Sequence, residues 1–192
     1  MIYIVNRKLR TGFDEYQKAL VNAIYEKFGL EITKEEKLPA HFTLKYWFET
    51  ENIRKIESVF EKFARTHKKT PVSVGRVNSF PPKVIFIDVR LSDDAKKVFF
   101  ELINELRKIP WMPWDKYDAE NLHFHSTIAE ECNEKYGAVM KFIQSKELQQ
   151  FDCWFDNITI VGPNVIAISE EIKTHGGNWL ESESSNICEL WE

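Results

Sequence analysis

The order of the predicted elements repeats once along the chain, and this repeat restricts the fold more than any other feature. In each half a short apolar strand leads into an amphipathic helix, then into a strand containing histidine and threonine, then into a second helix. The first strands lie near Ile4 and Ile87, an offset of 83, and the helices start at Asp14 and Asp94, an offset of 80. This period exceeds that of solenoid repeats. We therefore predict a duplicated strand-helix-strand-helix unit whose copies face each other.

Hydrophobic periodicity and end signals place the individual elements. The first helix carries an apolar residue at every fourth position and stops at Gly29, while the third opens with a cap at Ser92 and closes at Pro110. Helices are predicted over residues 13–29, 51–68, 92–110 and 133–146. Strands are predicted over residues 1–7, 41–48, 71–77, 84–90, 122–130, 153–162 and 164–172, the last two as a hairpin around Gly162-Pro163-Asn164.

The length and composition indicate one folded domain. The chain has 192 residues, of which 43% are hydrophobic and 14% aromatic, and such a chain buries a substantial core. No Gly-, Pro- or Ser-rich linker separates two independent units. We expect a single bilobal domain over residues 1–173, with pseudo-repeats of about 1–80 and 83–173, and a C-terminal tail over residues 174–192.

The net charge and the cysteines indicate which ligands and which cellular compartment to expect. The net charge is −4, so the overall field repels a long phosphate backbone, and no long duplex nucleic acid is expected as a ligand. Cys132, Cys153 and Cys188 are odd in number and form no CxxC pair, which suits a reducing compartment. No leader pattern or membrane-length apolar run is present. We expect a cytoplasmic monomer that does not bind membranes.

Two short stretches share the pattern histidine, any residue, threonine, aliphatic. These are "HFTL" at residues 41–44 and "HSTI" at residues 125–128, an offset of 84. Because successive side chains on a strand alternate between faces, we expect one polar and one mostly apolar face in each copy. The polar face carries His41, Thr43 and Lys45 in the first copy and His125 and Thr127 in the second. The opposite faces carry Phe42, Leu44 and Tyr46, and Phe124, Ser126 and Ile128.

Two imidazoles of near-neutral pKa supply what phosphodiester cleavage without a metal requires. One can take a proton from the nucleophile while the other protonates the leaving oxygen, each role giving a rate factor of roughly 10²–10⁴. The threonine two residues along can donate a hydrogen bond to a phosphate oxygen. The catalytic candidates are therefore His41, Thr43, His125 and Thr127. The alternative is that the two short patterns match by coincidence.

Other residues are weighed as further candidates. Lys45 can hold a phosphate or be solvated, and His123 can join His41 and His125 in a three-nitrogen zinc site or belong to the core. The aromatic loop before the second motif can stack on a nucleobase or be buried; it contains Trp111, Trp114 and Tyr117. His67 and His175 are assigned to the surface. The substrate-binding candidates are Lys45, His123, Tyr46 and Trp114, and no metal ligand is assigned.

The paired motifs resemble those of the 2H phosphoesterase superfamily, which contains the 2′-5′ RNA ligase-like proteins and 2′,3′-cyclic phosphodiesterases. The resemblance spans residues 1–172 and includes "NSFPPKVIFIDV" at residues 78–89, which is similar to the family's Phe-Pro turn. It implies an α+β, bilobal fold with two antiparallel-rich β-sheets flanking a central groove and helices outside. It also places His41, Thr43, His125 and Thr127 at the family's catalytic positions, with no cofactor.

The activity implied by this resemblance is hydrolysis of a 2′,3′-cyclic phosphate, on a nucleotide or an RNA end held in the groove, to a 2′-phosphate. On resemblance alone His125 is assigned as the base. Glu130 and Glu131 stand where many RNA ligase-like members have a basic residue, which disfavours ligation and long RNA. The alternatives are a 2′-5′ RNA ligase or phosphodiesterase acting on RNA or oligoadenylate, a non-catalytic nucleotide- or RNA-binding module, and a metal-dependent enzyme using His123 and His125.

Overall fold

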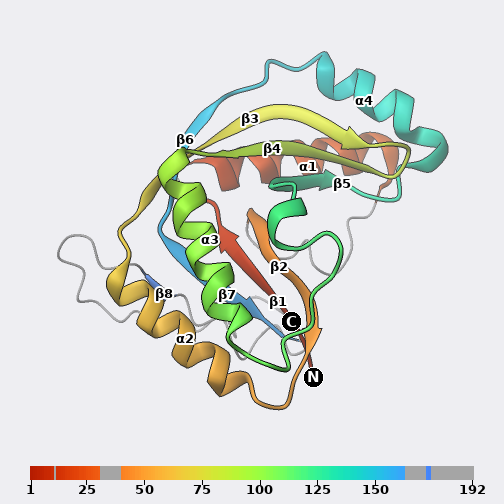
Figure 1. Ribbon diagram of the computed structural model, residues 1–192. Helices are drawn as coiled ribbons and strands as arrows, with labels where there is room; N and C mark the ends of the chain where they lie inside the picture. Colours follow the sequence, from red (N-terminus) through yellow and green to blue (C-terminus); the bar gives the residue numbers. More distant parts are fainter. Residues whose placement is uncertain (11, 31–39, 163–171, 174–192) are drawn as a thin grey trace, which may run out of the picture.

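The computed structural model describes residues 1–10, 12–30, 40–162 and 172–173, and its strands form two antiparallel sheets (Figure 1). The first sheet has the order β2-β1-β7-β8, and the second has the order β5-β4-β3-β6. The strands are β1 (Ile2–Lys8), β2 (His41–Glu49), β3 (Thr70–Phe80), β4 (Val84–Leu91), β5 (His125–Ala129), β6 (Phe151–Phe155), β7 (Asn157–Val161) and β8 (Ile172–Lys173). The helices are α1 (Phe13–Phe28), α2 (Ile53–Thr66), α3 (Asp93–Arg107) and α4 (Tyr136–Gln144), with short 3-10 turns at Ala119–Asn121 and Asn133–Lys135. The predicted α+β class is confirmed.

Each sheet combines strands from both predicted halves of the chain. β3 follows the first two helices but pairs with β4 and β6 of the second sheet, and β7 pairs with β1 of the first sheet. The single strand predicted over residues 153–162 is therefore wrong, because β6 and β7 belong to different sheets. The chain passes between the sheets at Asp156, which forms a 2.8 Å ion pair with the buried guanidinium of Arg7. Arg7 also donates to the carbonyl of Trp154.

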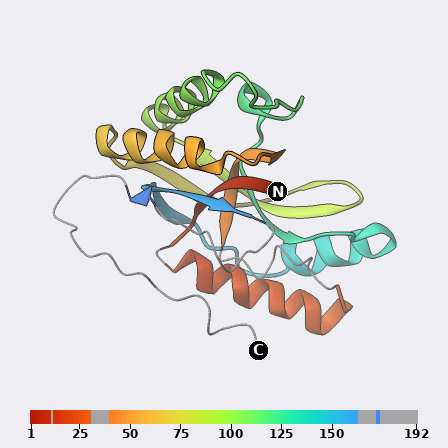
Figure 2. The ribbon, with the colours of Figure 1, turned by 90° about the horizontal axis from the view of Figure 1, so that it is seen from below.

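The helices cover the strands from two sides. Figure 2 shows α1 and α4 on one side and α2 and α3 on the other, and the rings of Phe28 and Phe142 join α1 to α4 at 5.5 Å. The predicted end signals are confirmed at two positions. Gly29 adopts a left-handed conformation (φ 61°) and donates to the Tyr25 carbonyl, and the hydroxyl of Ser92 accepts from the amide of Ala95. Within the described residues, every helix is too short or too polar to cross a membrane.

Candidate functional site

The two strands that carry the repeated motif lie against each other. β2 is one outer strand of the first sheet and β5 is one outer strand of the second, and the two strands are in contact. Phe42 of β2 contacts Phe124, the residue just before β5, and their ring centroids lie 5.7 Å apart at 81°. Phe42 follows His41 and Phe124 precedes His125, so each motif histidine is adjacent in sequence to one ring of this contact. The fold therefore brings together two motifs separated by 84 residues of chain.

The motif has the same strand geometry in both copies. His41 pairs with Lys8 and Thr43 with Asn6, while His125 pairs with Asp88 and Thr127 with Phe86. After each threonine the register shifts by one residue, so that Leu44 and Ile128 each occupy a bulge. The histidines and threonines are partly exposed and the residues between them are buried in both strands. The two aliphatic residues are fully buried.

The bulge corrects the prediction for Lys45. The alternation predicted that Lys45 shares the face of His41 and Thr43, but the extra residue at Leu44 places Leu44 and Lys45 both in the interior. The Lys45 side chain is 1% exposed, and its ammonium forms a 2.7 Å ion pair with the equally buried carboxylate of Asp118. Lys45 is thus neither a solvated strand end nor an exposed phosphate ligand.

A hydrogen bond to the backbone fixes the tautomer of His125 and leaves its Nε2 available. Its Nδ1 lies 2.6 Å from the backbone carbonyl of His123, and since a carbonyl can only accept, Nδ1 carries the proton. In the neutral ring, Nε2 then has the lone pair. The ring also packs against Phe86 at 4.7 Å and Phe80 at 5.3 Å between centroids. Burial lowers the pKa of His125 below its ordinary value, and the bond to the His123 carbonyl partly opposes this shift.

His123 belongs to the strand predicted over residues 122–130 but lies outside the observed strand, because β5 begins only at His125. Its Nε2 lies 2.9 Å from the carboxylate of Asp88, the β4 residue that pairs with His125 of β5. Among the residues that the structure describes, no three histidine, cysteine or acidic side chains gather in a metal-binding cluster. The three-nitrogen site of His41, His123 and His125 is therefore not formed, and the imidazole of His123 is paired with Asp88.

A family model named 2′-5′ RNA ligase superfamily matches residues 15–169 of this chain. The chain belongs to that superfamily. This membership confirms the resemblance to the 2H phosphoesterases that the paired motifs indicate. No curated protein sequence matches the chain.

Solved structures of low sequence identity share the fold of this superfamily member. The protein TT0787 of Thermus thermophilus is 15% identical with a TM-score of 0.62, covering 93% of this chain and 100% of its own. Usb1 of Kluyveromyces marxianus is also 15% identical, with a TM-score of 0.51 over 90% of this chain and 97% of its own. A second Usb1 structure, solved with uridine monophosphate, is 16% identical with a TM-score of 0.50, over 90% of this chain and 98% of its own. These likenesses establish the fold.

One contact to the second motif could not be predicted from the sequence of this superfamily member. Gln17 of α1 donates from Nε2 to the carbonyl of Thr127 at 2.7 Å, and its Oε1 accepts from the hydroxyl of Ser126, also at 2.7 Å. Gln17 lies 110 residues before Thr127 and belongs to no local pattern that marks a role in the site. Helix α1 thereby fixes the strand that carries His125.

The segment between α3 and β5 exposes several of its aromatic rings. Trp111 is 40%, Trp114 37% and Tyr117 57% exposed, so they are not core residues. The backbone N–H of Tyr46 donates to Asp118 in this segment. Burial, and then the charge of Asp118, raises the pKa of the Tyr46 phenol above its ordinary value. The phenol is protonated at neutral pH, as an ordinary tyrosine is.

Of the two remaining histidines, the structure describes His67 but not His175, and it describes only the end of the last predicted strand. His67 is not a plain surface residue, because it stacks on Phe63 at 3.7 Å between ring centroids and its Nε2 lies 2.7 Å from Glu101. His175 and residues 163–171 of the predicted hairpin lie outside the described residues. The end of that hairpin, β8, does pair with β7 in antiparallel fashion.

Proposed function

We propose that this protein hydrolyses 2′,3′-cyclic phosphates, on nucleotides or RNA ends, to 2′-phosphates by metal-independent acid–base catalysis. The observation that carries the proposal is the repeated geometry of His-x-Thr on two edge strands that lie in contact. In both copies the histidine and threonine occupy the partly exposed positions of the strand, and the same bulge follows them. Membership of the 2′-5′ RNA ligase superfamily supports a phosphoesterase or RNA-processing role.

In the proposed mechanism His125 is the general base. Its Nδ1 proton is committed to the His123 carbonyl, so Nε2 accepts a proton from the attacking water. The lowered pKa of His125 keeps this nitrogen unprotonated at neutral pH. The water oxygen forms a bond to phosphorus, and the bond from phosphorus to the 3′-oxygen breaks.

His41 is the general acid of the proposed mechanism and gives its proton to the leaving 3′-oxygen. The products are a 3′-hydroxyl and a 2′-phosphate, and the two histidines end with their protonation states exchanged until solvent restores them. The hydroxyls of Thr43 and Thr127 donate to the non-bridging phosphate oxygens, where negative charge increases in the transition state. The exposed ring of Trp114 and the protonated phenol of Tyr46 are proposed to contact the nucleoside, and His123 the phosphate.

The test is hydrolysis of 2′,3′-cyclic AMP and of a short RNA with a cyclic-phosphate end, in excess chelator. We expect turnover that yields the 2′-phosphate and falls by roughly 10²–10⁴ in both His41→Ala and His125→Ala. His67→Ala is the matched control, because His67 is a partly buried histidine that contacts Phe63 and Glu101 on α2 and α3. Unchanged kcat in either motif variant refutes the assignment. Activity that chelator removes refutes the metal-free mechanism.

A further inference from the structure

A buried charge stands at one position of the first motif strand where the second strand has none. Lys45 directly follows the bulge at Leu44, and the residue that directly follows the bulge at Ile128 is Ala129. Both positions are fully buried, at 1% exposure for Lys45 and 0% for Ala129. The strand geometry is therefore satisfied by a small apolar residue, and the lysine is an additional feature of the first copy.

The partner of this lysine organises the aromatic loop, defined as residues 110–118. One oxygen of Asp118 accepts from the Lys45 ammonium at 2.7 Å and from the Asp115 amide at 2.8 Å, and the other accepts from the Tyr46 amide at 2.9 Å. Asp118 therefore joins the aromatic loop to β2 at two consecutive residues. Figure 1 shows the segment after α3 running alongside β2 before it enters β5.

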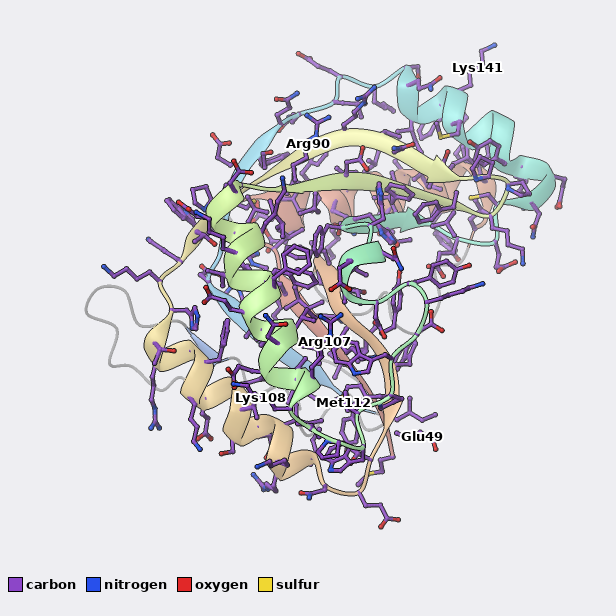
Figure 3. All side chains as sticks on the ribbon, viewed as in Figure 1. Glu49, Arg90, Arg107, Lys108, Met112 and Lys141 are labelled. Carbon is purple, nitrogen blue, oxygen red and sulfur yellow. The ribbon has the colours of Figure 1, made fainter. Side chains whose placement is uncertain are left out.

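Two cations, Lys45 and Arg107, contact the ring of Trp114. The Lys45 ammonium lies 5.4 Å from the ring centroid, and the guanidinium of Arg107 lies 5.5 Å from it. Arg107 is fixed in turn by two 2.8 Å bonds to Glu120, and Figure 3 shows Arg107 at the end of α3, beside the loop that contains Met112. Trp114 is nevertheless 37% exposed, so part of its ring is available to a ligand.

A fully buried ion pair contributes little net stability compared with apolar residues of similar size, because removing both charges from water is costly. Its effect is geometric, since each charge requires the other at hydrogen-bond distance. Here the requirement links the strand of His41 to the loop that leads into the strand of His125. Lys45 lies four residues after His41, roughly 13 Å along the strand at about 3.3 Å per residue.

We propose that Lys45 and Asp118 are positioning residues that fix the aromatic loop, so that its rings favour cyclic phosphates that carry a nucleobase over those of a bare sugar. This inference rests on the proposed function and specifies its substrate class. Aromatic rings stack on any nucleobase with an affinity of roughly 1–3 kcal/mol per base, whereas a bare sugar gains nothing from them.

The experiment compares 2′,3′-cyclic AMP with 1-O-methylribose 2′,3′-cyclic phosphate in Asp118→Asn and in Lys45→Met/Asp118→Asn. The asparagine keeps an acceptor oxygen for the Tyr46 amide, and the double variant removes both charges, so at least one variant is expected to fold. Lys69→Met is the matched control, since the Lys69 ammonium lies 4.7 Å from the Trp154 ring centroid on another part of the surface. We expect KM for the nucleotide to rise about 5- to 150-fold, with kcat and the KM of the sugar phosphate within twofold.

Equal increases of KM for both substrates, or no increase for the nucleotide in a folded variant, overturn the inference. Hydrogen exchange at the Asp115 amide, whose acceptor oxygen on Asp118 is replaced by an NH2 group, gives a second readout. We expect this exchange to accelerate in both Asp118 variants but not in Lys69→Met. If the native protein turns over neither substrate, the proposed function fails. The positioning role is then decided by tryptophan fluorescence titration with the same two ligands, where selective loss of nucleotide binding supports it and equal loss refutes it.

Discussion

Replacing Gln17 with leucine tests whether helix α1 fixes the second motif strand. The variant leaves the Ser126 hydroxyl, on a residue that is 1% exposed, without its 2.7 Å acceptor, and it removes the donor to the Thr127 carbonyl. An unpaired buried hydroxyl costs about 1–3 kcal/mol, and the lost amide bond about 0.5–1.5 kcal/mol. We therefore expect the free energy of unfolding to fall by roughly 2–4 kcal/mol in Gln17→Leu.

Urea unfolding at neutral pH measures this loss. With a slope of about 2 kcal/mol/M, the midpoint is expected to fall by roughly 1–2 M. Adding Ser126→Ala to the variant removes the unpaired hydroxyl and is expected to recover about 1–2 kcal/mol. Gln144→Leu, at an exposed position of α4, is the control and is expected to change stability by less than about 0.5 kcal/mol. A loss no larger than in this control, or a second substitution that only adds to the loss, refutes the role of Gln17.

Three further predictions concern buried and charged groups. Phe80→Ala uncovers the ring of His125 and is expected to raise the pKa of His125. Asp88→Asn removes a negative charge that favours the imidazolium and is expected to lower that pKa. NMR titration measures both shifts. Because the folded-state pKa of His125 lies below its unfolded value, the unfolded chain binds more protons and the native protein loses stability as pH falls through the unfolded value. His125→Gln should therefore lose less Tm between pH 8 and pH 5 than the native protein. Lys45→Met alone leaves Asp118 buried without its countercharge and is expected to cost about 3–5 kcal/mol in urea unfolding.

Local sequence patterns predicted the parts of the site that depend on local rules. The repeated His-x-Thr pattern identified the two strands now found in contact, and the alternation of faces holds in both strands up to each threonine. The alternation fails at Lys45, because a bulge inserts one residue without any change in the period of the sequence. The alternation of residues along a strand therefore cannot predict where a bulge occurs.

The roles of three polar residues depend on distant partners. Asp88 contacts His123 from the neighbouring strand, Asp118 holds Lys45 across 73 positions, and Gln17 reaches Thr127 across 110. Each looks like an ordinary polar residue in its own segment. Sequence periodicity describes which face of an element is buried, but it does not say which element will cover that face.

The sequence by itself determined the duplicated order of elements, the helix ends at Gly29 and Ser92, and the two motifs, because turn geometry, capping and hydrophobic period act over a few residues. Tertiary structure alone decided that β3 and β7 exchange sheets, that a bulge follows each threonine, and that Lys45 is buried against Asp118. These features arise from pairing between segments far apart in the chain. The free energy of such pairing depends on which segment is the partner, and the sequence of one segment alone does not specify it.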